Sequence, residues 1–127
     1  VALDPSVTQI PNKAFQYRPN LETIKLHRGV TSIGGFAFDG CVSLKYINLH
    51  ESSVDIIDSY AFYECVLLKI VKLPPSLKRI NKQAFYCCTS LTIINLSECS
   101  LLEEIGRGAF AGCISLMAVY FPQSLQR

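Results

Sequence analysis

The sequence lacks several features that mark membrane proteins and nucleic-acid-binding proteins. Among 127 residues it has no tryptophan, one methionine and two histidines. Charged residues interrupt every apolar run before it reaches the roughly 18 residues that a membrane-spanning helix needs. The twelve basic and ten acidic residues are scattered along the chain, so they form no basic cluster of the kind that binds nucleic acid. We therefore expect no membrane insertion in this segment and no nucleic-acid partner.

Motifs of catalysis and of metal binding are missing as well. The chain has no glycine-rich phosphate loop, no Gly-x-Ser-x-Gly and no carboxylate pair held on a shared scaffold. A zinc site needs spaced pairs of ligands, and the only cysteine pair is the adjacent Cys87 and Cys88. His27 and His50 occupy equivalent places, but two imidazoles without a third ligand favour solvated turn residues. The sequence thus predicts a protein that is not an enzyme and that holds neither a metal nor a cofactor.

What the sequence does contain is a repeat that covers nearly all of it. The clearest copy is IGGFAFDGCVSLKYINL, residues 33–49, and its apolar skeleton occurs five times. The Ala-Phe pairs of consecutive copies are 23, 24, 23 and 25 residues apart. Such a period predicts a solenoid, and leucine-rich repeats span about 20–29 residues. We expect one leucine-rich-repeat domain over residues 1–127, with five repeats of 23–25 residues.

Both ends of the sequence fall inside a repeat. Val1 and Leu3 correspond to Ile24 and Leu26, while residues 121–127 copy residues 73–79. A solenoid normally ends in a capping unit of different sequence that shields the last layer of the core. The sequence is therefore expected to be a fragment of a longer array.

Each repeat divides into three pieces. The pattern Leu-x-x-Ile-x-Leu predicts a short strand over about residues 22–26, 45–49, 69–73, 92–96 and 117–121. One strand per coil implies a parallel sheet, and a second, shorter extended segment follows each turn. The Ala-Phe-x-x-Cys piece predicts a single helical or 3-10 turn. The fold class is then an α/β repeat: a curved, right-handed leucine-rich-repeat solenoid with a parallel β-sheet on its concave face and the short turns opposite.

Equivalent positions in stacked coils form columns of like side chains. One column predicts a ladder of aromatic rings, formed by Phe15, Phe38, Phe62, Phe85 and Phe110. A second column holds four of the six cysteines, Cys41, Cys65, Cys88 and Cys113. Because the Cβ directions along a column are parallel, we expect free, buried thiols there rather than disulfides.

Three other residues mark exceptions to the cysteine column. Arg18 takes the column position in the first repeat, so that position is expected to open to solvent. Cys87 and Cys99 lie off the column, and Cys99 belongs to the longest turn, between Leu96 and Leu102. These two are the better candidates for an exposed, reactive thiol or for a disulfide to another molecule.

The candidate ligand-binding residues flank the buried isoleucine of each predicted strand, where side chains point to the concave face. They are Thr23, Lys25, Tyr46, Asn48, Ile70, Lys72, Ile93, Asn95 and Tyr120. Tyr46, Ile70 and Ile93 would form an exposed apolar patch, as binding surfaces do, although strand propensity alone explains these residues equally well. None of the nine is acidic, so a strongly basic ligand is not expected.

The full pattern, Ile-Gly-x-x-Ala-Phe-x-x-Cys-x-x-Leu-x-x-Ile-x-Leu-Pro, is most complete at residues 33–49 and 105–122 and resembles the BspA-like leucine-rich repeat family. The chain departs from it where glycine follows the isoleucine only at Gly34 and Gly106. The resemblance implies a cell-surface or secreted protein that binds a protein ligand in adhesion or recognition, without catalysis. The alternatives are a structural spacer within a larger protein and a cytoplasmic location. Exposed end repeats would also allow weak self-association.

Overall fold

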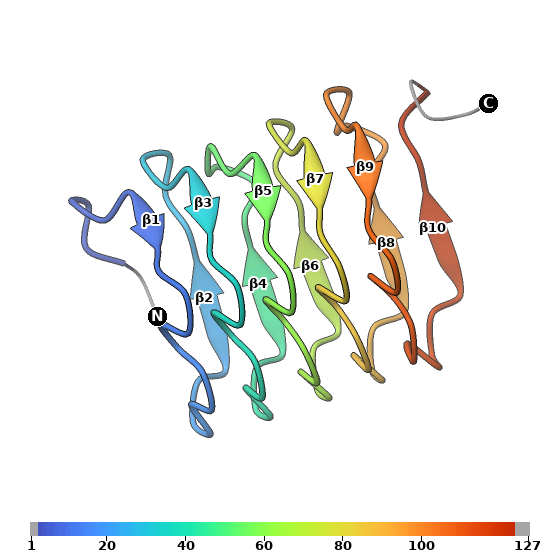
Figure 1. Cartoon of the computed structure of the whole chain (residues 1–127), viewed down its shortest axis with the longest axis horizontal. Coiled ribbons are helices and arrows are strands. Elements are labelled where there is room, and N and C mark those ends of the chain that lie inside the picture. Colours follow the sequence, from blue (N-terminus) through green and yellow to red (C-terminus); the bar gives the residue numbers. More distant parts are fainter. Residues whose placement is uncertain (1–2, 124–127) are drawn as a thin grey trace.

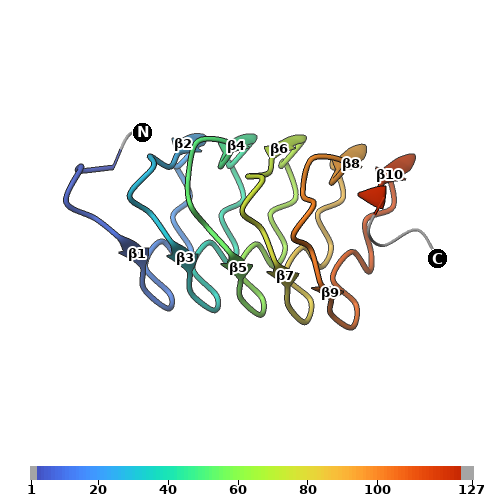
Figure 2. The same ribbon diagram turned by 90° about the horizontal axis from the view of Figure 1, so that it is seen from above.

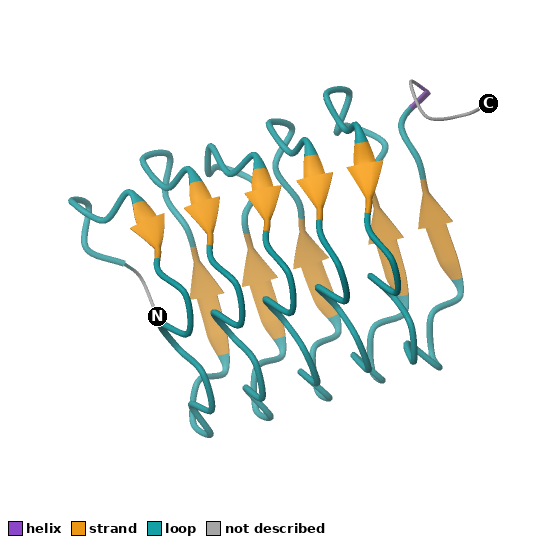
Figure 3. Ribbon diagram, in the orientation of Figure 1, coloured by secondary structure: helices purple, strands orange, loops and turns teal. Residues whose placement is uncertain are grey.

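The computed structural model describes residues 3–123 as a row of stacked coils (Figure 1). Each complete coil contributes a three-residue strand and a two-residue strand, and both run parallel to their counterparts in the neighbouring coils (Figure 3). The predicted repeat solenoid is thus confirmed, whereas its right-handed curvature stays a prediction. The expected cut ends at Val1 and Arg127 lie outside the described residues.

The longer strands lie together on one side of the solenoid. They are β2 (Thr23–Lys25), β4 (Tyr46–Asn48), β6 (Ile70–Lys72), β8 (Ile93–Asn95) and β10 (Ala118–Tyr120). All five lie within the predicted ranges. The central residue is buried in β2, β4, β6 and β8, because alternate side chains of a strand point to opposite faces. We call the outward side of these five strands the strand face.

The shorter strands form a second row on the opposite side (Figure 2). They are β1 (Gln9–Ile10), β3 (Ser32–Ile33), β5 (Ile56–Ile57), β7 (Arg79–Ile80) and β9 (Glu104–Ile105). These strands pair in chain order into one continuous parallel sheet. The second extended segment predicted for each repeat is therefore confirmed.

The Ala-Phe pieces are not the helical turns that the sequence predicted. Alternate amides of this piece donate to the next coil: Phe36 N to Ser59 O at 3.1 Å, Phe38 N to Ala61 O at 2.7 Å and Gly40 N to Tyr63 O at 2.8 Å. A helix would direct these amides to its own carbonyl groups. The backbone bonds that join the coils thus replace those that would have formed a helix.

Backbone conformation gives a second reason for the absence of helix in these pieces. The residue before each alanine has a positive φ, as Phe36 (58°), Tyr60 (62°) and Gln83 (52°) show. A positive φ at the third position is what a type II turn requires, and it interrupts a right-handed helix. Stacking offsets part of the strain, because the rings of Phe36 and Tyr60 lie 4.7 Å apart.

The core is organised around the predicted phenylalanine ladder, which is confirmed. Successive rings from Phe15 to Phe110 have centroids 5.0–5.5 Å apart and planes inclined by only 1–11°. Arg18 is exposed, as expected, and its guanidinium carbon lies 5.9 Å from the centroid of the Phe15 ring. The first ring of the ladder is therefore covered by a cation rather than by another ring.

Candidate binding face

The nine candidate residues all belong to the strands of the strand face. Register places Tyr46 between Thr23 and Ile70, and it places Asn48 between Lys25 and Lys72. On the last two strands Ile93 lies beside Ala118 and Asn95 beside Tyr120. The rows predicted from the sequence are thus present, and ligand binding by them stays a prediction.

The apolar members of these rows differ in exposure. Ile70 is 52% exposed and Ile93 is 48% exposed, whereas Tyr46 is half-buried. Tyr120, at the end of the row, is also exposed. Ile70 and Ile93 are therefore the central apolar groups that the strand face offers to a partner.

Asn48 and Asn95 have a structural role that the sequence reasoning missed. The Oδ1 atom of Asn48 accepts a hydrogen bond from His50 N at 3.0 Å, and Asn95 Oδ1 accepts one from Ser97 N at 3.0 Å. Asparagine commonly binds the backbone two residues further on in this way, so the spacing alone could have indicated it. The amide NH₂ group of each side chain remains for a ligand, while Asn95 Oδ1 also accepts a bond from Ser97 Oγ at 2.6 Å.

Lysines on this side of the molecule fall into two groups. Lys25 pairs with Glu51 at 3.8 Å and Lys45 pairs with Glu22 at 3.7 Å. Within residues 3–123, no carboxylate lies within ion-pair distance of Lys69 or Lys72, and both side chains are exposed. Positive charge that no carboxylate balances is thus concentrated around β6.

The sheet behind the strand face is interrupted between β6 and β8. It consists of a three-stranded part, β2-β4-β6, and a two-stranded part, β8-β10, and Figures 1 and 2 show the wider step between them. Elsewhere the leucine after each strand donates to the next coil, as in Leu49 N to Lys72 O at 2.8 Å. In the described part of the chain, Leu73 N makes no such bond to Asn95 O.

The interruption coincides with the longest turn of the chain. Cys99, in the turn after β8, is only 1% exposed, and its thiol donates to Pro74 O at 3.4 Å. The prediction of an exposed, reactive Cys99 is therefore wrong. Burial raises the pKa of this thiol to about 11. We attribute the wider step between the coils to the packing of Cys99 beneath the segment that follows β6.

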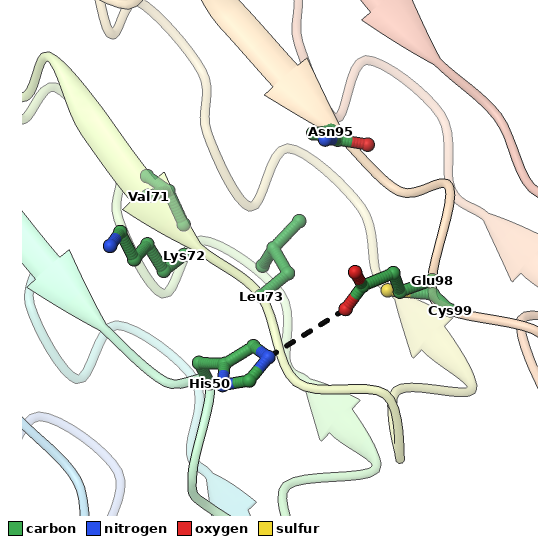
Figure 4. Close-up of a pocket in the computed structure, with 7 residues that line it drawn as sticks. All are labelled: His50, Val71, Lys72, Leu73, Asn95, Glu98 and Cys99. Carbon is green, nitrogen blue, oxygen red and sulfur yellow. Dashed lines mark ion pairs between the residues drawn. The ribbon is translucent and has the colours of Figure 1, made fainter.

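Two adjoining hollows open along this interruption. The first, of about 270 Å³, is lined by Lys69, Ile70, Val71, Thr92, Ile93 and Asn95. The second, of about 220 Å³, is lined by the residues drawn in Figure 4, namely His50, Val71, Lys72, Leu73, Asn95, Glu98 and Cys99. Val71 and Asn95 line both hollows, and we call the region of the two together the seam.

The predicted column of buried cysteines is confirmed in its central part. Cys41, Cys65 and Cys88 are fully buried, Cys113 is half-buried, and all six cysteines are free. Each column thiol donates to the phenylalanine carbonyl of the preceding coil, for example Cys65 Sγ to Phe38 O at 3.1 Å. Burial raises the pKa of all four column thiols, so they are poor nucleophiles. Cys87 is half-buried and is the more accessible off-column thiol.

The two histidines have different polar partners. His27 Nδ1 accepts a hydrogen bond from Gly29 N at 3.1 Å, while His50 Nε2 lies 3.6 Å from Glu98 Oε1. Across residues 3–123, the structure brings together no three side chains of the kinds that hold a metal ion. Over the same range it has no helix with the length and apolar character needed to cross a bilayer.

Comparisons with known proteins agree with this architecture. A family profile described as "BspA type Leucine rich repeat region" matches residues 8–127 in six copies. A leucine-rich repeat protein of Treponema pallidum is similar over 94% of this chain and 56% of its own, with 34% identity and a TM-score of 0.87. One from Bacteroides ovatus is similar over 98% of this chain and 31% of its own, with 36% identity and a TM-score of 0.85. No curated protein matches. The chain thus spans about half of the first of these proteins and about a third of the second.

Proposed function

Because the chain belongs to the BspA-type leucine-rich repeat family, we propose that it is a non-catalytic module that binds a protein ligand through its strand face. The observation that carries the proposal is the pair Ile70 and Ile93, about half exposed at the centre of that face. Exposed apolar groups surrounded by polar rows are typical of interaction surfaces. Leucine-rich repeat proteins generally act in protein interaction.

Strand pairing within each of the two parts of the strand face supports the same proposal. The side chains of this face project from paired strands, and the buried centres of those strands pack on the core that contains the phenylalanine ladder. A preformed surface loses little conformational entropy when it binds, which favours affinity. Within β2, β4 and β6, and within β8 and β10, the strand face therefore offers a ligand positions that are already set.

A cell-surface or secreted location and a role in adhesion form the finer part of the proposal. They are supported by the resemblance to the BspA-like family alone. The competing proposal is a structural spacer, in which the repeats hold other parts of a longer protein apart and bind nothing themselves.

Binding to a panel of purified extracellular-matrix and serum proteins, measured by biolayer interferometry, tests these proposals. We expect the double variant Tyr46→Ala/Ile70→Ala to lower the affinity for any protein that binds by at least tenfold, since central interface residues commonly contribute about 1–2 kcal/mol each. The control is Val42→Ala/Val66→Ala, which removes exposed apolar groups that lie off the strand face. Equal affinity of the double variant and the parent would show that the wrong face was chosen. Absence of binding to every protein would favour the spacer.

Self-association stays a separate proposal. Ile114 and Met117, in the last described coil, are both highly exposed, which favours it. Light scattering over a range of concentrations tests it, and a monomer at the highest concentration would contradict it.

A further inference from the structure

We propose that the seam between β6 and β8 is the docking site for an extended, acidic segment of a protein partner. The inference rests on the proposed function, because it assigns the contact to one place on the strand face and gives the partner a chemical character. Four features of the seam support it: open backbone groups, an accessible apolar floor, hollows the size of side chains, and lysines without a carboxylate partner.

Backbone groups along the seam lack the partners that they have elsewhere. The amide before each strand normally donates to the preceding coil, as in Lys69 N to Lys45 O at 3.0 Å and Met117 N to Thr92 O at 2.8 Å. In the described chain the equivalent bond, from Thr92 N to Lys69 O, is missing, as is the one from Leu73 N to Asn95 O. The facing edges thus present two amide donors that a ligand can bind.

The floor of the seam is the only part of this strand row, from β2 to β8, where the core approaches solvent. Val71 is 8% exposed and Leu73 is 6% exposed, whereas the equivalent Ile47 and Leu49 are fully buried. Ile70 and Ile93 line the first hollow. An occupant therefore needs apolar groups to cover this floor as well as polar groups to reach its edges.

The width of the seam determines how an occupant fits. Some Cα atoms of β6 and β8 still lie within 8 Å of each other, and a strand inserted between them would need about 9.6 Å, which is two strand spacings. The occupant's backbone is thus placed on the solvent side, with its side chains entering the two hollows of about 270 and 220 Å³. Such volumes accept one or two side chains each.

Charge around the seam selects an acidic occupant. Lys69 lines the first hollow and Lys72 the second, and neither is neutralised by a carboxylate within the described residues. Glu98, the acidic residue that lines the second hollow, has its Oε1 atom 3.6 Å from His50 Nε2 (Figure 4), and the two form an ion pair when the imidazole is protonated. A carboxylate on the partner would accept hydrogen bonds from the edge amides and pair with either lysine, and such charge-assisted bonds are the stronger kind.

Fluorescence anisotropy with two labelled ten-residue peptides tests the proposal. One peptide alternates valine with aspartate, and the other alternates valine with lysine. We expect the acidic peptide to bind at least tenfold more tightly than the basic one. We also expect Lys69→Ala/Lys72→Ala to weaken the acidic peptide at least tenfold. The matched control, Lys78→Ala/Lys82→Ala, removes two exposed lysines that flank β7, away from the strand face, and should change its affinity less than twofold.

Hydrogen exchange on the same complexes locates the peptide. Slower exchange at Leu73 and Thr92 on adding the acidic peptide is the expected result. The proposal that the seam is a docking site would be overturned by equal binding of the two peptides or by no binding of either. Equal losses of affinity for the acidic peptide in the two lysine variants would also overturn it. Each of these results leaves the proposed function intact, because that is decided separately by the protein panel and the Tyr46→Ala/Ile70→Ala variant.

Discussion

Truncation of the central ring of the phenylalanine ladder gives the most direct test of how the solenoid is stabilised. Phe62 is fully buried and stacks on Phe38 and Phe85, each with a centroid distance of 5.0 Å. Phe62→Ala therefore removes one buried side chain and two ring contacts, and substitutions of this type cost about 3–5 kcal/mol. Since a domain is typically stable by about 5–15 kcal/mol, we expect the loss of a third or more of the total.

Phe15→Ala is the matched control for this prediction. Phe15 is half-buried and has a single stacking partner, Phe38, at 5.1 Å. We expect it to cost roughly half as much as Phe62→Ala, because one ring contact of about 0.5–1.5 kcal/mol is lost instead of two. Urea unfolding followed by circular dichroism measures both values. A cost for Phe62→Ala no greater than that for Phe15→Ala would refute the view that stacking through the ladder holds the coils together.

Three further predictions concern thiols, pH and a close backbone contact. Ellman's reagent should label Cys87 in the native protein and all six cysteines after unfolding, with or without reductant; fewer than six without reductant would contradict the free thiols. Burial raises the pKa of the Cys99 thiol from 9.0 to about 11 and also raises that of Cys65. The native state therefore retains protons that the unfolded chain loses above pH 9. The stability that comes from the raised thiol pKa is fully present below pH 9 and is lost as the pH rises towards 11. Over that range the unfolding constant increases about tenfold per pH unit for each thiol. We therefore expect the urea midpoint to decrease as the pH rises from 8 to 10, and a constant or rising midpoint would contradict this prediction. Gly34→Ala would place a Cβ atom 2.6 Å from Asn12 N and 2.8 Å from Pro11 C. We expect a cost of about 1–3 kcal/mol in urea unfolding, whereas Gly29→Ala, which meets mainly the His27 side chain at 3.1 Å, should cost less.

The features that the sequence predicted well are those that repeat in every coil. The alternation around Ile24, Ile47 and Ile94 defines which side of each strand is buried, and stacking then places identical residues over one another. The strands, the ring ladder, the cysteine column and the rows of the strand face all follow from this.

The features that the sequence did not predict depend on backbone conformation and on contacts between coils. Tyr60 and Gln83 are not residues that favour a positive φ, so the left-handed turns could not be recognised from residue type. The seam depends on how the extra residues of the turn between Leu96 and Leu102 pack against the preceding coil. A longer surface turn in general costs little, since loop closure depends weakly on length. Instead, Cys99 is buried against Pro74, and the effect extends to the strands.

The contrast between the two sheets also has a mechanical consequence. On the back of the molecule β7 and β9 remain paired, and the Ala-Phe turns of the same two coils are joined by Phe85 N to Ala109 O at 2.8 Å. On the strand face, those coils share no backbone hydrogen bond within the described residues. Backbone hydrogen bonds therefore join these two coils on the back of the molecule but not on the strand face. We expect the solenoid to bend most easily at this step. Tension along its long axis would bend the protein outward at this step first, widening the strand face while the back sheet carries the load.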